Sequence, residues 1–137
     1  MRQILTDCWA LEIPEEWQAE KDDDTIVISD ADNVSTIEIT AVRKAEGDVS
    51  GAELADFSSE LNELSLPRKE TTLGDFDGFI YEYDEEEYFC RDWFTAFKDV
   101  CLLVSYTCLI EDKTFDDAAV DQILDGISYL PVGALDK

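Results

Sequence analysis

The chain has 137 residues, 45% of them hydrophobic, which is enough for one domain with its own core and excludes a disordered protein. It carries 34 Asp and Glu residues against 10 Lys and Arg residues, a formal net charge of -24, and it contains no histidine. The missing histidine excludes catalysis and metal binding through imidazole, and the negative charge argues against binding to nucleic acid or anionic membranes, whose phosphate groups would be repelled.

The predicted elements begin close to the N-terminus. The apolar run Ile4–Leu5 is shorter than a signal peptide needs, and no stretch reaches the roughly 20 apolar residues of a membrane-spanning helix. We therefore expect a soluble, cytoplasmic protein. It is expected to be a single domain over 1–137, with 132–137 as a frayed tail.

Three short strands are predicted before the first helix. Residues 9–13 alternate until Pro14, residues 25–29 form a β-branched run, and residues 36–42 alternate again. Acidic turns flank the second strand. Trp17, which follows the Pro14 turn, is expected in the core.

A helix with a well-marked start comes next in the chain. Ser50 and Glu53 have the spacing of a capping box, in which each side chain satisfies a free amide at the helix start. A buried stripe is expected at helical spacing, and Pro67 is expected to end the helix. The stripe consists of Leu54, Phe57, Leu61 and Leu64.

Four more strands are predicted at 70–73, 76–83, 88–97 and 100–110. Their short links require antiparallel pairing. Both faces of the last two strands are mostly apolar, so we expect them to be central and covered on both sides. A second helix is expected from Thr114 to just before Pro131.

The sequence thus predicts an α+β fold in the order βββαββββα. We expect a mainly antiparallel sheet of six or seven strands between helices, an α/β/α arrangement.

Two features carry the resemblance of this chain to a known family. The order of elements and the motif I-P-x-x-W, present as Ile13–Trp17, resemble the PsbP-like superfamily, and the ending Ser128–Leu130 is similar to its S-x-L ending. That superfamily includes PsbP of photosystem II, the Ran-binding Mog protein, DcrB-like proteins and effector-associated chaperones of type VI secretion. The resemblance implies an antiparallel sheet between helices, and it does not imply one function.

The cysteines indicate no metal or redox site. Their spacing includes no C-x-x-C pair, and three of them lie in apolar strand patterns, so we expect reduced and mostly buried thiols. They are Cys8, Cys90, Cys101 and Cys108. We predict no catalytic residue, no cofactor site and no metal site.

The candidate partner site is the acidic tip, a hairpin end with six residues: Tyr83, Asp84, Glu85, Glu86, Glu87 and Tyr88. Tyrosines beside carboxylates suit a protein-binding surface, and Tyr81 is expected to flank the tip as well. A solvated turn is the alternative, since charge runs are usually solvated. Glu82 and Arg91 face each other across the hairpin and are expected to form a structural ion pair.

These patterns favour a non-enzymatic protein-binding module that recognises a basic or partly apolar protein partner. A secretion-associated chaperone and a toxin-neutralising protein are two forms of this hypothesis. A carboxylate-based enzyme, an acidic DNA mimic and a homodimer remain open.

Overall fold

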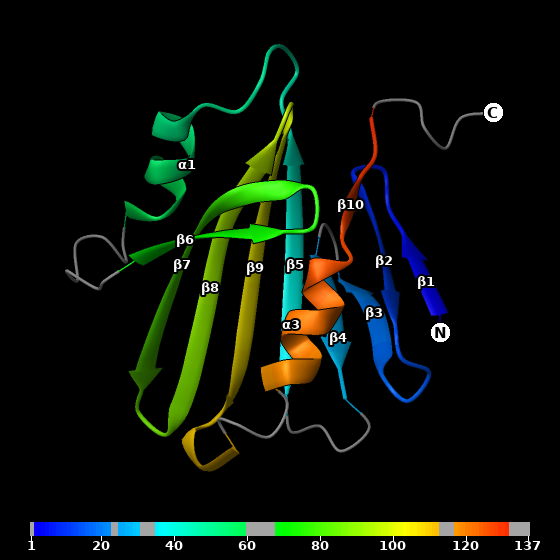
Figure 1. Cartoon of the computed structure of the whole chain (residues 1–137), viewed down its shortest axis with the longest axis vertical. Helices are drawn as coiled ribbons and strands as arrows, with labels where there is room; N and C mark the ends of the chain where they lie inside the picture. Colours follow the sequence, from blue (N-terminus) through cyan, green and yellow to red (C-terminus); the bar gives the residue numbers. More distant parts are fainter. Residues whose placement is uncertain (1, 23–24, 31–34, 60–67, 113–116, 132–137) are drawn as a thin grey trace.

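The fold is described from a computed structural model, over residues 2–22, 25–30, 35–59, 68–112 and 117–131. Two antiparallel sheets and two α-helices make up this part of the chain (Figure 1). The predicted α+β class with a mainly antiparallel sheet is confirmed. No helix within these ranges is long and apolar enough to cross a bilayer.

The larger sheet has seven strands, and every neighbouring pair is antiparallel. From one edge to the other they are β3 (Gln18–Asp22), β4 (Thr25–Ser29), β5 (Thr36–Arg43), β9 (Val100–Leu109), β8 (Tyr88–Phe97), β7 (Phe76–Glu85) and β6 (Arg68–Leu73). The strands β8 and β9 lie near the middle, as the sequence predicted.

A second, smaller sheet is not hydrogen-bonded to the larger one within the described residues. Its order is β1 (Arg2–Leu5), β2 (Trp9–Ile13) and β10 (Ser128–Tyr129). The sequence predicted a single sheet and missed three strands, namely β1, β3 and β10. These strands carry little apolar alternation, and β3 is exposed along its whole length, so only pairing with neighbours defines them.

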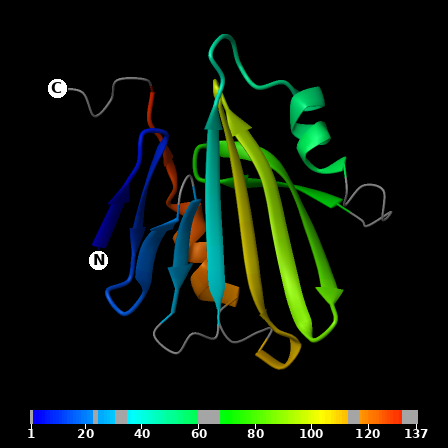
Figure 2. The same cartoon turned by 180° about the vertical axis from the view of Figure 1, so that it is seen from behind.

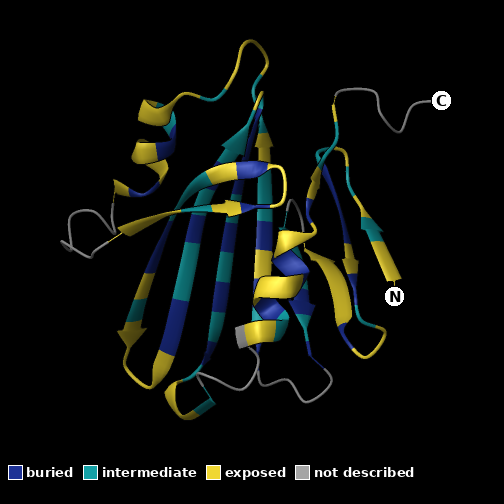
Figure 3. Cartoon of the chain, viewed as in Figure 1, coloured by how far each residue is buried: buried dark blue, intermediate teal, exposed yellow. Residues whose placement is uncertain are grey.

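The core lies between one face of the larger sheet and a cover made of the smaller sheet and α3 (Asp117–Asp125). Buried positions on both sides form one cluster, with Trp9 and Leu11 from β2, Trp93 from β8 and Leu124 from α3. Figure 3 shows buried and exposed segments alternating along α3, which lies over the larger sheet. Trp17 is 4% exposed and belongs to this cluster, which confirms its expected place. The predicted start of this helix at Thr114 lies outside the described residues.

The opposite face of the larger sheet carries α1 (Gly51–Phe57), whose Leu54 lines the same hollow as Phe79 of β7. The capping box is confirmed, because the Ser50 hydroxyl accepts from the Glu53 amide at 3.1 Å and the Glu53 carboxylate accepts from the Ser50 amide at 3.1 Å. The expected burial of Phe57 is wrong: it is the last residue of α1 and is 46% exposed. Leu61, Leu64 and Pro67 fall outside the described residues.

Two glycines allow the hairpin of β6 and β7 to bend across the end of α3, as Figures 1 and 2 show. A Cβ atom at Gly78 would lie 1.9 Å from the Phe94 carbonyl oxygen on the neighbouring strand. Gly74 has a φ of +57° at the hairpin turn, and a Cβ there would lie 1.9 Å from the Ile127 carbonyl oxygen. Only glycine permits these approaches, which bring Phe76 into the core.

Candidate functional site

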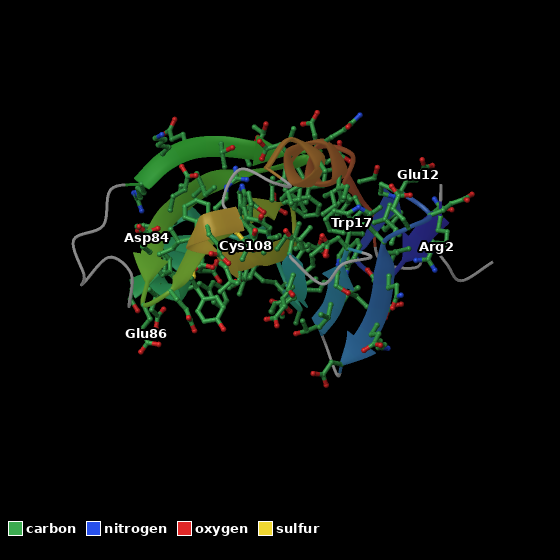
Figure 4. The ribbon with its side chains drawn as sticks, turned by 90° about the horizontal axis from the view of Figure 1, so that it is seen from below. Arg2, Glu12, Trp17, Asp84, Glu86 and Cys108 are labelled. Atoms are coloured by element: carbon green, nitrogen blue, oxygen red, sulfur yellow. The ribbon has the colours of Figure 1, made fainter. Side chains whose placement is uncertain are left out.

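The acidic tip is the end of the hairpin that joins β7 to β8. Glu85 pairs with Tyr88, so Glu86 and Glu87 form a two-residue turn. Glu86 has a φ of 56°, a left-handed conformation that favours glycine. All four acidic side chains from Asp84 to Glu87 are exposed. The hairpin therefore projects its charge into solvent at one end of the molecule, where Figure 4 labels Asp84 and Glu86.

A short 3-10 helix, η1 (Ile110–Asp112), lies against this tip. The Ile110 amide donates to the Glu87 carbonyl oxygen at 2.9 Å, and Tyr88 pairs with Leu109. The contact places Glu111 and Asp112 close to the hairpin. Sequence reasoning missed these two carboxylates, because the apolar run 100–110 predicts one strand and no local pattern marks the two residues after it.

Two large apolar side chains are exposed among these carboxylates. Tyr88 is 41% exposed and Ile110 is 38% exposed. We call this combined area the tip surface, defined by Asp84, Glu85, Glu86, Glu87, Tyr88, Ile110, Glu111 and Asp112. It offers negative charge together with two exposed apolar side chains, which suits a partner with cationic and apolar groups.

Tyr83 and Tyr81 are held within the sheet and not at the tip surface. The Tyr83 hydroxyl donates to Asp92 Oδ2 at 2.7 Å, and burial together with this bond raises the pKa of Tyr83 well above its usual range. Tyr81 is fully buried and packs against Phe79 and Phe94. The expectation that Tyr81 flanks the tip at the surface is therefore wrong, because its ring fills an aromatic cluster instead.

The expected ion pair between Glu82 and Arg91 is present, with Arg91 Nε 3.4 Å from Glu82 Oε2. Arg91 Nη2 also donates to Asp121 Oδ1 at 2.9 Å, and the guanidinium lies 4.7 Å from the centre of the Trp93 ring. The arginine thus joins β7, β8 and α3. These contacts support a structural role for the pair of Glu82 and Arg91.

Most basic side chains make contacts within the molecule. Their partners are carboxylates, carbonyl oxygens or aromatic rings. The residues are Arg2, Arg43, Lys44, Arg68, Lys69, Arg91 and Lys98. Seven of the ten Lys and Arg residues in the sequence therefore have a partner among the described residues.

The thiols show no sign of activation. Cys90, Cys101 and Cys108 are buried and Cys8 is half-buried, so the expected burial is confirmed, and all four are free. Burial, with a smaller effect of the Glu53 charge, raises the pKa of Cys101 to about 12. Burial also raises the pKa of Cys8 and of Cys90, so these thiols are poor nucleophiles at neutral pH. Across the described residues, no group of three or more Cys, Asp and Glu side chains is placed to hold a metal ion.

Comparison with known proteins shows the fold. No family model and no curated protein sequence matches the chain. The chain is similar in structure to cyanobacterial PsbP (CyanoP) from Synechocystis sp. PCC 6803, with a TM-score of 0.64 and 8% identity, over 93% of this chain and 91% of that one. The chain therefore has a fold similar to that of CyanoP.

Two further structures share this architecture. LpqN, involved in cell envelope biogenesis of Mycobacterium tuberculosis, matches with a TM-score of 0.62 and 15% identity over 90% of this chain and 83% of that one. A protein from Bacteroides thetaiotaomicron VPI-5482 matches with a TM-score of 0.67 and 14% identity over 91% of this chain. The chain spans 46% of that protein's length. At these identities the similarity concerns the fold alone.

Proposed function

We propose that the protein is a non-enzymatic protein-binding module that recognises a basic or partly apolar partner through its acidic tip. The observation that carries the proposal is the tip surface, where exposed Tyr88 and Ile110 lie among the carboxylates of the hairpin and η1. Carboxylates attract a cationic partner over a distance, and the apolar side chains provide contact area that can be desolvated.

The carboxylates around Arg91 favour binding over catalysis. A carboxylate-based enzyme needs two acids free to exchange protons near a substrate. Asp121 lines a polar hollow of about 470 Å³ together with Arg91, and that arginine ion-pairs with both Asp121 and Glu82. These carboxylates are engaged with a cation, so their arrangement favours a structural role.

A secretion-associated chaperone that holds a basic effector and a protein that neutralises a basic toxin both fit the charge. The formal net charge of -24 makes either role compatible with fast, electrostatically steered association.

A triple variant at the turn tests the proposal. A partner is first recovered from native lysate at low salt, and its binding rates are then measured with purified proteins. We expect Glu85→Gln, Glu86→Gln and Glu87→Gln together to slow association about tenfold at low salt, because steering by charge is weakened. The matched control removes the same number of negative charges elsewhere, on β3 and in the loop after β5. It combines Glu20→Gln, Asp22→Asn and Glu46→Gln, all at exposed positions.

Tyr88 supplies an independent measurement on the same partner. Tyr88→Ala should leave the association rate nearly unchanged and speed dissociation about tenfold, because desolvated contact is lost. If the partner binds equally well at high salt, or if the turn variant behaves like the control variant, the acidic tip is a solvated turn and the proposal is wrong.

A further inference from the structure

A groove with a volume of about 400 Å³ runs between β2 and α3, on the side of the molecule away from the acidic tip. Its walls are mostly small or apolar, with amides and a single carboxylate at the rim. The lining residues include Ala10, Glu12 and Pro14 from β2 and its end, Ala119 and Gln122 from α3, and Gly126.

The groove lies along a strand edge that is only partly paired. The Trp9 carbonyl oxygen accepts from the Thr6 amide at 2.9 Å, so the backbone groups of Trp9, Leu11 and Ile13 point towards β1. The Cys8 carbonyl oxygen accepts from the Leu130 amide at 2.9 Å on the other side. By the same alternation, the amide and carbonyl groups of Ala10 and Glu12 point towards β10.

The partner strand ends before it reaches Glu12. β10 pairs with Trp9 and Ala10 only, and the chain before Ser128 turns away into α3. Within the described ranges no strand pairs with Glu12 on this side. Its amide and carbonyl groups therefore face the groove as a free donor and acceptor, and Pro14, which has no amide hydrogen, marks the end of the open edge.

The two edges of the larger sheet differ from this one. β3 carries Glu20, Lys21 and Asp22 along an exposed edge, and β6 carries Arg68, Lys69 and Glu70. Charged side chains of this kind discourage the addition of another strand. At Glu12, in contrast, the open edge adjoins a groove with room for side chains.

We propose that this groove binds an extended segment of a basic partner protein, which adds to β2 as a strand and hydrogen-bonds the backbone of Glu12. Alternate side chains of such a segment would enter the groove against Ala119, while the others would lie on the outer face beside the Glu12 carboxylate. The segment is therefore one of alternating apolar and cationic residues. The net charge of -24 favours this cationic pattern over an acidic one.

This surface goes beyond the proposed function, because it lies at the opposite end of the molecule from the acidic tip. Figure 4 shows Glu12 at one end, and Asp84 and Glu86 at the other. Both surfaces favour a basic partner, but each can be altered without touching the other.

Residue-resolved hydrogen exchange of the full chain tests the inference, with the capped peptide Lys-Val-Lys-Val-Lys-Val as the probe. In the free protein we expect the Glu12 amide to exchange faster than the amides of Leu11 and Ile13, which β1 protects. At a free peptide concentration ten times its dissociation constant, exchange at Glu12 should slow about tenfold. The capped peptide Glu-Val-Glu-Val-Glu-Val should leave it unchanged.

Two substitutions test whether the Lys-Val peptide binds in the groove. Gln122→Trp fills the groove from an exposed position on α3 and should weaken binding of the Lys-Val peptide about tenfold or more, whereas Ala118→Trp, exposed on the same helix, should not. Glu12→Pro removes the proposed donor and should also weaken binding. Retained protection of Leu11 and Ile13 confirms that each variant is folded.

Three results would overturn the inference. The first is peptide binding that is unchanged by Gln122→Trp and leaves Glu12 exchange unaltered, which would place the peptide elsewhere and leave the proposed function of the acidic tip intact. The second is no binding of the Lys-Val peptide at all. The third is protection of Glu12 that rises with protein concentration alone, which would make a second copy of the chain the occupant.

Discussion

Among single residues, Trp17 stands at the point where the chain passes from the smaller sheet to the larger one. It follows β2 and precedes β3 in the chain, its amide donates to the Pro14 carbonyl oxygen at 3.1 Å, and its side chain lies in the core cluster. We expect Trp17→Ala to lower the free energy of unfolding by about 3–5 kcal/mol, because a large aromatic site is emptied. Urea unfolding measures the loss. The control Phe57→Ala, at a residue 46% exposed, should change stability by under about 1 kcal/mol. An equally small loss for Trp17 would place it at the surface.

Asp99 links three segments through its carboxylate. It accepts from the Tyr129 hydroxyl at 2.6 Å and from Arg43 Nη1 at 2.8 Å, and Arg43 also donates to the Asp7 carbonyl oxygen. The bond from Tyr129 and the contacts of Arg43 hold the pKa of Asp99 below its usual range. The folded pKa is thus below the unfolded value of about 3.9, so this stabilisation is present above that pH and is lost as the pH falls through the folded pKa.

Because the pKa of Asp99 is lowered in the folded state, the stability of an Asp99→Asn variant should depend on pH. At neutral pH the variant should be less stable than the wild type, and the difference should narrow as the pH falls below about 4. Unfolding free energies measured from pH 7 down to about 3 give the comparison. Tyr129→Phe, which removes the largest cause of the lowered pKa, should show the same trend. A difference that stays constant over this range would contradict the assignment.

At the scale of elements, the bend of β7 depends on Gly78. We expect Gly78→Ala to destabilise the fold by about 3 kcal/mol or more, because the new Cβ would lie 1.9 Å from the Phe94 carbonyl oxygen and neither backbone can move away cheaply. Thermal unfolding measures the effect. Gly51→Ala is the control, since a Cβ there meets nothing within 4 Å at the start of α1. Similar stability for the two variants would show that the bend tolerates a side chain.

Elements with strong local patterns were predictable, and those defined by pairing were not. The alternation of 88–97 and of the strand after it, and the capping box at Ser50, are properties of a few neighbouring residues. β3 has no buried residue, and the division into two sheets depends on contacts between distant segments. The short α1 shows the same limit, because Phe57 fits the helical stripe yet remains exposed at the helix end.

At the scale of the whole molecule, the sequence predicted five of the eight residues of the tip surface, from Asp84 to Tyr88. The hairpin end at Asp84–Glu87 follows from a charge run between two strand patterns. Ile110, Glu111 and Asp112 join the tip surface through the hydrogen bond from Ile110 to Glu87, which no local sequence pattern indicates. The burial of Tyr81 could not be predicted either, because both faces of its strand carry aromatic residues and only the packing distinguishes them.

The net charge has a consequence for the stability of the entire fold. With a formal charge of -24 and most cations held in local contacts, repulsion among carboxylates should oppose folding. Added salt shortens the screening length from about 30 Å at 0.01 M to about 10 Å at 0.1 M, so the melting temperature should rise as sodium chloride is added. The triple Gln variant at Glu85, Glu86 and Glu87 carries a charge of -21, three units less negative than -24, and should show a smaller rise. A melting temperature that falls with salt would show that ion pairs such as Arg43 with Asp99 outweigh the repulsion.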